Sequence, residues 1–284
     1  MASGAVSRIL RISRVVAELE RAEAFYRDAL GFHRVPDSFG PSILSQLFGI
    51  ARTGITGQVM RLGTDEIALV QFDLPGARYL EHSRSNDLGF QHLAIVVNDM
   101  GAAYRRLMAH TPQAISTGGP QTLPPRNGGV TAFKFRDPDG HPLELLHFPP
   151  GQGRQVWHAR RTGPCLGIDH SALAVAEAGR SLLFYQHLGF QVTARSSNHG
   201  PAQSRLDDLP NARASVTSLR PPAPEGPGLE LLAYDPPGHP APNAILTDWV
   251  TLLCPGLPAP TLLRDPDGHR MLLTGTDRGT TAPA

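Results

Sequence analysis

The chain has 284 residues, a formal net charge of +1 and 40% hydrophobic residues. This length predicts about two domains. The near-neutral charge, without a basic run, argues against nucleic acid as a partner, and no stretch approaches the about 20 apolar residues of a membrane span. The only cysteines, Cys165 and Cys254, lack the spacing of a disulfide framework or thiolate metal site. We therefore expect a cytoplasmic protein with no nucleic-acid or membrane partner.

The first half of the chain predicts two units of strand, helix and further strands. Apolar periodicity and turn residues give the following elements in order: a strand at 10–16, a helix at 18–30 ending at Gly31, strands at 57–62 and 66–72, a connector at 73–88, a strand at 90–97, a helix at 100–109, and a hairpin of 130–136 with 142–148. We assign residues 1–149 to a first module built from units one and two.

The second half repeats this order in a shorter form. After a linker at 150–167 we expect a strand at 168–175, a helix at 179–188 and strands at 191–194, 214–219 and 228–234. Proline and glycine crowd the fourth unit where its helix should be, so we expect that unit to be truncated. Units three and four form a second module at 168–276, and 277–284 is expected to be a frayed tail.

Two phrases recur in the chain. Arg136-Asp137-Pro138-Asp139-Gly140-His141 returns as 264–269, and Phe25-Tyr26-Arg27-Asp28-Ala29-Leu30-Gly31-Phe32 returns one residue shorter as 184–190. Repetition at this scale indicates one module present twice. With these phrases the four units resemble the vicinal oxygen chelate superfamily, which includes glyoxalase I, methylmalonyl-CoA epimerase, extradiol dioxygenases and bleomycin-binding proteins.

This resemblance implies an α+β fold of four βαβββ units, whose mixed, curved sheets pair into cups with a divalent metal at the bottom. In the family, one ligand typically comes from the first strand and one from the last strand of a unit. The matching residues here are His92, Glu144, His170 and Glu230, all from units two and three. Each shares a strand face with small or apolar residues, where an unpaired carboxylate would be costly. These four residues are the predicted metal ligands.

Units one and four lack these ligands. Arg11 and Ala68 occupy the places of His170 and Glu230, Leu272 occupies that of Glu144, and Asp248 is the best match for His92. Pairing unit two with three, and one with four, gives one complete site and one cup without metal. Pairing one with two gives two half-sites, which a homodimer could bring together. We prefer the first arrangement because it satisfies all four buried polar groups.

Imidazoles and carboxylates suit Zn, Fe, Mn, Co or Ni without choosing among them. The leading hypothesis is a metal-dependent lyase or isomerase that acts on a small molecule with vicinal oxygens through an enediolate, with Glu144 or Glu230 as the catalytic base. One alternative is an extradiol dioxygenase with Fe or Mn on His92, His170 and Glu144, which is disfavoured if Glu230 also binds the metal. Another is a metal-free drug-binding protein of the bleomycin-resistance type.

The sequence says little about the substrate. Residues 38–52 could form an insert over the mouth of a cup, and 196–201 reads as a polar loop near the entrance. His199, Arg126 and Arg205 are candidates for contacting an anionic substrate. The histidines and aspartates of the repeated turn, and Tyr26 and Tyr185, are expected to be structural.

Overall fold

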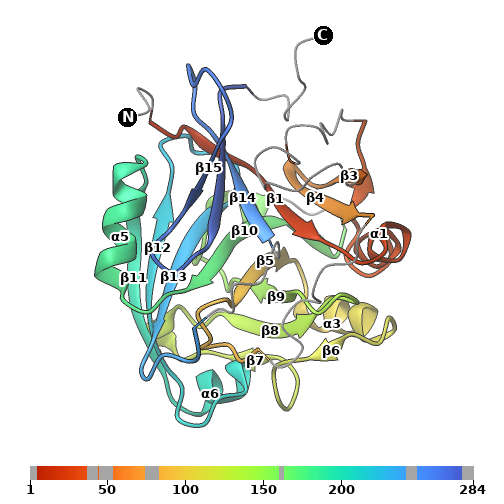
Figure 1. Ribbon diagram of the computed structural model, residues 1–284. Coiled ribbons are helices and arrows are strands. Elements are labelled where there is room, and N and C mark those ends of the chain that lie inside the picture. Colours follow the sequence, from red (N-terminus) through yellow and green to blue (C-terminus); the bar gives the residue numbers. More distant parts are fainter. Residues whose placement is uncertain are drawn as a thin grey trace.

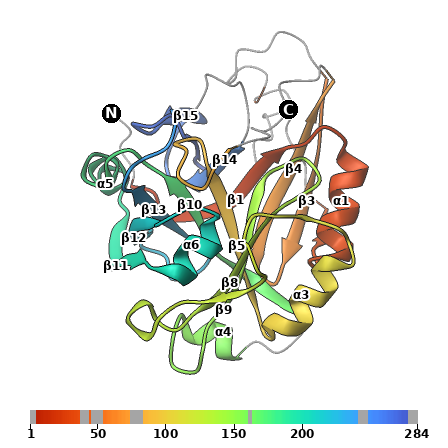
Figure 2. The ribbon, with the colours of Figure 1, turned by 90° about the horizontal axis from the view of Figure 1, so that it is seen from below.

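In the computed structural model the strands form two mixed sheets, and the structure describes residues 5–36, 44, 54–73, 83–159, 163–240 and 248–276. A seven-stranded sheet has the order β15-β16-β14-β1-β4-β3-β2. A nine-stranded sheet has the order β11-β12-β13-β10-β5-β9-β8-β6, with β7 paired to β8. Helices α1 and α5 lie on opposite sides of the molecule, and α3 lies beside α1 (Figures 1 and 2). The predicted α+β class of βαβββ units with cup-like sheets is confirmed.

The elements of the first half are β1 (Arg8–Val15), α1 (Leu19–Asp28), β2 (His33–Arg34), β3 (Ile55–Leu62), β4 (Asp65–Phe72), β5 (Gln91–Val97), α3 (Met100–Met108), β6 (Gln113–Ala114), β7 (Gln121–Thr122), the 3-10 turn η1 (Pro125–Asn127), β8 (Thr131–Arg136) and β9 (Pro142–His147). Those of the second half are α4 (Gln155–Ala159), β10 (Cys165–Ala174), α5 (Ala178–His187), β11 (Gln191–His199), α6 (Pro201–Asp207), β12 (Arg213–Arg220), β13 (Gly228–Tyr234), β14 (Asp248–Leu253), β15 (Thr261–Arg264) and β16 (Arg270–Thr274). Within the described residues, no helix is long and apolar enough to cross a membrane.

At the centre of each sheet, a strand from one half of the chain pairs with a strand from the other half. Strand β5 of unit two pairs antiparallel with β10 of unit three, and β1 of unit one pairs antiparallel with β14 of unit four. Each half therefore contributes to both sheets, and units two and three form one cup within a single chain. This is the arrangement that we preferred from the sequence, and it needs no second copy of the chain.

Strict alternation separates the main core from the inner face of each cup. On β5, Leu93, Ile95 and Val97 point into a large apolar core that also contains residues of β1, β9, β10, β14, α1 and α5. His92 and Ala94 point the other way. Because side chains alternate along a strand, the same residues that anchor β5 also fix the direction of His92.

The repeated phrases contact each other within each half of the chain. The hydroxyl of Tyr26 on α1 donates to Asp137 of the first turn at 2.9 Å, and the hydroxyl of Tyr185 on α5 donates to Asp265 of the second turn at 3.0 Å. Both tyrosines are completely buried. A buried hydroxyl requires such a partner, so helix and turn are retained together in both halves.

The histidine that ends each repeated turn fastens the turn to a first strand. His141 Nε2 lies 2.7 Å from the carbonyl oxygen of Val15, and His269 Nε2 lies 3.0 Å from that of Ala174. Both imidazoles are buried. These contacts agree with the structural role that we expected for them.

Two segments that we expected to be a linker and a loop contain strand and helix instead. Strand β10 begins at Cys165, inside the segment expected to be a linker, because Cys165 pairs with Val97. Helix α4 also lies in that segment. The segment 196–201 is not a loop: β11 continues to His199, paired to β12 as far as Arg213, and α6 starts at Pro201. The tail 277–284 and the insert 38–52, apart from Leu44, lie outside the described residues.

The cup of units one and four has an apolar cluster on its inner face. Ser13 on β1 corresponds to Ala172 on β10. Ala172 pairs with His92, and Ser13 pairs with Trp249. Trp249, and not Asp248, therefore occupies the place of His92. Trp249 is 1% exposed and packs in an apolar cluster with Ala68 and Leu272. Our assignment of Asp248 to this place was wrong because that residue points to the other face of β14.

Asp248 contributes to a buried polar cluster instead. Its carboxylate lies 3.2 Å from His141 Nδ1 and 3.8 Å from Arg14 Nη1. Arg14 in turn donates to the carbonyl oxygen of Pro142 at 3.0 Å. This cluster joins β1, β14 and the first repeated turn.

Candidate metal centre

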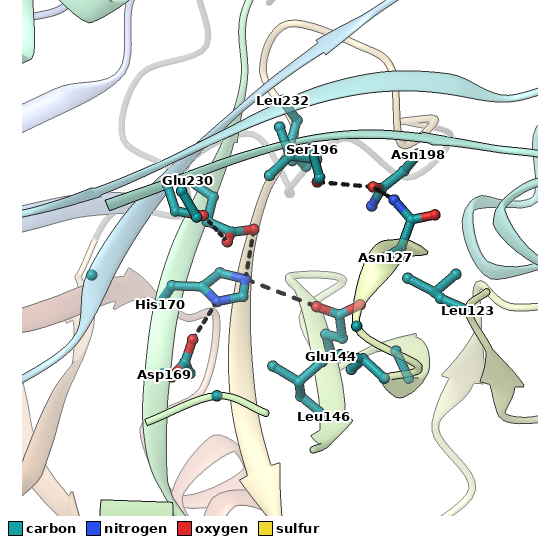
Figure 3. Close-up of a pocket in the computed structure, with 18 of the residues that line it drawn as sticks. Leu123, Asn127, Glu144, Leu146, Asp169, His170, Ser196, Asn198, Glu230 and Leu232 are labelled. Atoms are coloured by element: carbon teal, nitrogen blue, oxygen red, sulfur yellow. Dashed lines mark hydrogen bonds and ion pairs between the residues drawn. The ribbon is translucent and has the colours of Figure 1, made fainter. Parts of the chain in front are cut away.

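A cavity of about 670 Å³ lies on the inner face of the nine-stranded sheet. All four predicted ligands line it: His92 on β5, Glu144 on β9, His170 on β10 and Glu230 on β13. Figure 3 shows Glu144 and Glu230 directed at the same ring nitrogen of His170, with Asp169 at the other nitrogen. The central position of β5 and β10 in this sheet brings residues more than 130 positions apart to one point.

Three of the four residues form a close group. His92, Glu144 and His170 each offer a ligand atom, and these atoms lie within 4.8 Å of one another. His92 Nε2 is 3.2 Å from Glu144 Oε2, and His170 Nε2 is 4.0 Å from the same oxygen. All three side chains are buried. Such a group of two imidazoles and one carboxylate is a common ligand set for a divalent ion.

Glu230 stands beside this group. Its Oε2 is 3.4 Å from His170 Nε2, and its Oε1 accepts a hydrogen bond from Ser218 Oγ at 2.7 Å. Its side chain is 22% exposed, whereas that of Glu144 is 7% exposed. Glu230 therefore reaches the same imidazole from the more open side of the cavity.

A β-bulge orients His170. The register between β10 and β5 shifts between Ile168 and His170, so Asp169 is an extra residue and lines the cavity together with His170. Asp169 Oδ2 lies 3.0 Å from His170 Nδ1, and Asp169 Oδ1 accepts from Trp157 Nε1 at 2.7 Å. Bulges commonly redirect side chains next to active sites. No pattern in the sequence indicates this bulge.

Burial and the neighbouring charges shift the pKa values of the two imidazoles in opposite directions. Burial and then Lys134 lower the pKa of His92 to about 4. Burial also lowers the pKa of His170, but the carboxylates of Glu230, Asp169 and Glu144 outweigh it and raise that pKa to about 9. Burial alone would raise the pKa of Glu144, yet His92, Lys134 and His170 lower it to about 2. Glu144 is thus a fixed anion.

The residues present fit a divalent metal ion. His170 Nε2 and His92 Nδ1 are buried without a hydrogen-bond partner among the described residues. His170 presents Nε2 to two carboxylates while Asp169 occupies Nδ1, which is the orienting arrangement typical of metal-binding histidines. A cation at this point would be held between His170 Nε2 and the two carboxylates, which contact this nitrogen without a hydrogen bond.

Next to Glu144, the wall of the cavity contains a polar network that we did not predict. Lys134 Nζ donates to Asp207 Oδ1 at 2.6 Å, and Asp207 Oδ2 accepts from Gln203 Nε2 at 2.6 Å and from the Tyr234 hydroxyl at 3.1 Å. All four residues are at most 5% exposed. Lys134 is the only lysine in the chain, beside 25 arginines. A single lysine among so many arginines could have marked Lys134 as a candidate site residue. Its partner Asp207 could not be found in this way, because it lies on α6, a helix that we did not predict.

Of the three candidate substrate contacts, one lines the cavity. Arg126 of η1 does so and donates to the carbonyl oxygen of His199 at 3.3 Å. His199, at the end of β11, and Arg205, which donates to Gln121 Oε1 at 2.7 Å, lie outside the lining. Further arginines that we did not name, Arg154, Arg195 and Arg220, line the cavity.

Comparisons with known proteins agree with this geometry. Residues 8–145 match the family described as the Glyoxalase/Bleomycin resistance protein/Dioxygenase superfamily. A 2-epi-5-epi-valiolone epimerase from Actinomyces sp is 30% identical over 156 residues, which cover 52% of this chain and 82% of that protein. The uncharacterized protein YaeR of Escherichia coli K12 is 29% identical over 140 residues, or 49% of this chain and 95% of that protein.

Solved structures show the same fold over nearly the whole chain. Glyoxalase I from Zea mays has a TM-score of 0.62 at 17% identity, with 95% of this chain and 93% of that chain covered. A putative dioxygenase from Bacillus subtilis has a TM-score of 0.56 at 14% identity, with 95% and 86% covered. From the sequence relatives and the fold together, the chain belongs to the glyoxalase/bleomycin resistance protein/dioxygenase superfamily.

Proposed function

We propose that the protein is a metal-dependent lyase or isomerase that acts on a small molecule with two vicinal oxygens, by proton transfer through an enediolate. The observation that carries this proposal is the position of Glu230, a carboxylate that lies next to the compact histidine and glutamate group without being part of it. Such a residue is placed to act as a base beside a metal-bound substrate. Similarity to an epimerase supports the reaction class.

His92, Glu144 and His170 would hold the ion, with Glu230 as a fourth ligand that can leave. A divalent ion bound there supplies a Lewis acid that stabilises negative charge on substrate oxygens. The chain does not select among Zn, Fe, Mn, Co and Ni, since imidazole and carboxylate ligands suit all of them. All four groups come from one chain, so a homodimer is compatible with this site but not required by it.

Glu230 is better suited than Glu144 to remove the proton. Glu144 is buried and held by His92, and its pKa of about 2 makes it a weak base. Glu230 is more exposed and keeps Oε2 directed toward the centre of the cavity while Ser218 holds Oε1. We therefore assign Glu144 to metal binding and Glu230 to proton transfer next to the substrate carbonyl.

A second candidate function is an extradiol dioxygenase. The group of His92, His170 and Glu144 is a two-histidine, one-carboxylate set, which is typical of non-haem Fe(II) oxygenases. In that case Glu230 would not bind the metal, and the three residues would hold an ion that could accept a catechol and dioxygen. The two functions differ in whether the protein consumes oxygen.

The test begins with metal analysis, for which we expect close to one divalent ion per chain. Deuterium exchange into hydroxyacetone then reports proton removal next to a carbonyl, and an oxygen electrode with catechol reports the alternative. We expect Glu230→Gln to retain the ion and to lose at least about 100-fold in the exchange rate. Glu144→Gln should instead lose the ion. Protein that binds no ion after reconstitution would overturn both functions, and oxygen uptake with catechol would favour the second.

The proposal also includes the binding partner and the cellular location of the protein. A small molecule is the expected partner because the cavity has a volume of about 670 Å³ and is lined by both polar and apolar side chains. Cys165 and Cys254 are both buried and neither forms a disulfide, in keeping with the cytoplasmic location that we propose.

A further inference from the structure

The cavity is lined by a lysine, Lys134, whose ammonium group uses only part of its hydrogen-bonding capacity. Lys134 is 3% exposed and lines the cavity, and within the described residues its ammonium donates to one acceptor, Asp207 Oδ1. An ammonium group carries three donors. Two N–H groups of Lys134 are therefore left for something inside the cavity.

Gln203 presents the complementary feature. Its amide nitrogen donates to Asp207 Oδ2, which fixes the orientation of the amide because a carboxylate can only accept. The other end, Oε1, is buried and has no hydrogen-bond partner among the described residues. Gln203 is 4% exposed and also lines the cavity. A buried acceptor without a partner is rare in folded proteins and points to a missing donor.

Asp207 fixes both groups in place. Its side chain receives Lys134, Gln203 and Tyr234, and its backbone carbonyl oxygen accepts from Ser85 Oγ at 2.9 Å. The carboxylate outweighs the effect of burial on Lys134 and raises the pKa of the ammonium, which stays charged. The donor and the acceptor are thus preorganised around one anion.

This network lies next to the candidate metal ligands. Lys134 on β8 is directly opposite Glu144 on β9, and side chains paired in this way have Cβ atoms about 4.5–5.5 Å apart. Both side chains face the cavity. A small molecule held at His92, Glu144 and His170 would therefore reach Lys134 with its next atoms.

We propose that Lys134 and Gln203 form a subsite for a hydroxyl group of the substrate, adjacent to the two oxygens that would bind the metal. The hydroxyl oxygen accepts from the Lys134 ammonium, and its hydrogen is donated to Gln203 Oε1. The substrate class is then a molecule with at least three neighbouring oxygens, such as a hydroxylated ketone or polyol. This inference rests on the proposed function because it takes the metal site as its reference point.

Two hydroxamates that differ by one hydroxyl test the subsite. Acetohydroxamate offers only the two chelating oxygens, whereas glycolohydroxamate adds a hydroxyl on the next carbon. We expect the Zn-loaded protein to bind glycolohydroxamate about tenfold or more tightly than acetohydroxamate by calorimetry, the gain typical of a hydrogen bond to a charged group. In protein labelled with 15N-lysine, the single Nζ signal should shift with glycolohydroxamate and much less with acetohydroxamate.

Variants assign the preference to the two residues. Gln203→Met keeps the ion pair of Lys134 with Asp207, so it is expected to fold and to reduce the ratio of the two dissociation constants severalfold. Lys134→Met should bring the ratio close to one. Gln121→Met is the matched control: Gln121 anchors Arg205 of α6 but does not line the cavity, so the ratio should stay at the wild-type value.

The outcomes separate the two levels of the proposal. Equal affinity of the wild-type protein for both hydroxamates would overturn the subsite while leaving the metal site intact. A tenfold preference that persists in both Gln203→Met and Lys134→Met would also overturn it. Failure to bind metal and either hydroxamate would overturn the proposed function, and the subsite with it.

Discussion

Replacement of Asp169 by asparagine tests whether the bulge residue orients a metal ligand. Asp169 accepts from two donors at once, His170 Nδ1 at 3.0 Å and Trp157 Nε1 at 2.7 Å. An asparagine has one oxygen and one amino group at these positions. Whichever way the amide turns, the amino group faces a donor, so one of the two hydrogen bonds is lost.

The size of the effect follows from the role of this contact. Asp169 holds His170 with Nε2 toward Glu144 and Glu230, and outer partners of metal-binding histidines are typically worth 10–100-fold in metal affinity. We expect Asp169→Asn to weaken Zn²⁺ binding by this factor, or about 1.4–2.7 kcal/mol. In Trp157→Phe/Asp169→Asn the indole donor is absent, so the amide oxygen can face His170, and affinity should recover in part.

Competition with a chromophoric chelator measures these affinities, and thermal melts of the metal-free proteins check that each variant folds. Trp157→Phe alone is the control, because it leaves the carboxylate on His170 and should change affinity little. The reasoning is refuted if Asp169→Asn binds Zn²⁺ as tightly as the wild type. It is also refuted if the double variant is as weak as the sum of the two single losses.

Three further outcomes are expected. Burial lowers the pKa of His170 but neighbouring carboxylates outweigh it and raise it to about 9, so His170 carries a proton at pH 7.5 that a metal must displace. Calorimetry in buffers of different ionisation enthalpy should find about one proton released per ion at pH 7.5 and almost none above pH 10, with His92 contributing none because its pKa is about 4. Tyr26→Phe and Tyr185→Phe should each lower the free energy of unfolding by about 1.5–3 kcal/mol in urea titrations, since each removes a buried hydrogen bond to a carboxylate; a loss in only one would contradict the equivalence of the two turns. Ala68→Glu should add no second ion by metal analysis and should destabilise the protein, because its carboxylate would enter an apolar cluster.

The parts of the fold that the sequence predicts are those set by local pattern. Strand β13 has the predicted bounds, Gly228–Tyr234, because alternation and flanking turn residues mark both ends. The inward direction of His92 follows from the same alternation on β5. The four candidate ligands came from their places in repeated units, and the structure brings them to one cavity.

Long-range packing explains what the sequence did not reveal. The bulge at Asp169 depends on the pairing of β10 with β5, which are on opposite sides of the midpoint of the chain. Helix α6 has seven residues and owes its place to contacts such as Ser116 Oγ with the carbonyl oxygen of Leu206. Asp248 and Trp249 are adjacent on one strand, and a shift of one residue exchanges the faces of that strand. The fourth unit is shorter than the others, so the sequence comparison placed its strand one residue out of register and selected Asp248 in place of Trp249.

The second cup shows which parts of the module serve the fold and which serve the site. Strand β1 carries a register shift between Ile9 and Arg11, at the place where β10 has its shift between Ile168 and His170. Arg11 lies where His170 would be, and it pairs with Glu66 at 3.4 Å. The irregular backbone has thus been kept in a cup that lacks the ligand set. We infer that the bulge belongs to the way two units join at their first strands, and that the metal site of the other cup makes use of a distortion that the fold already requires.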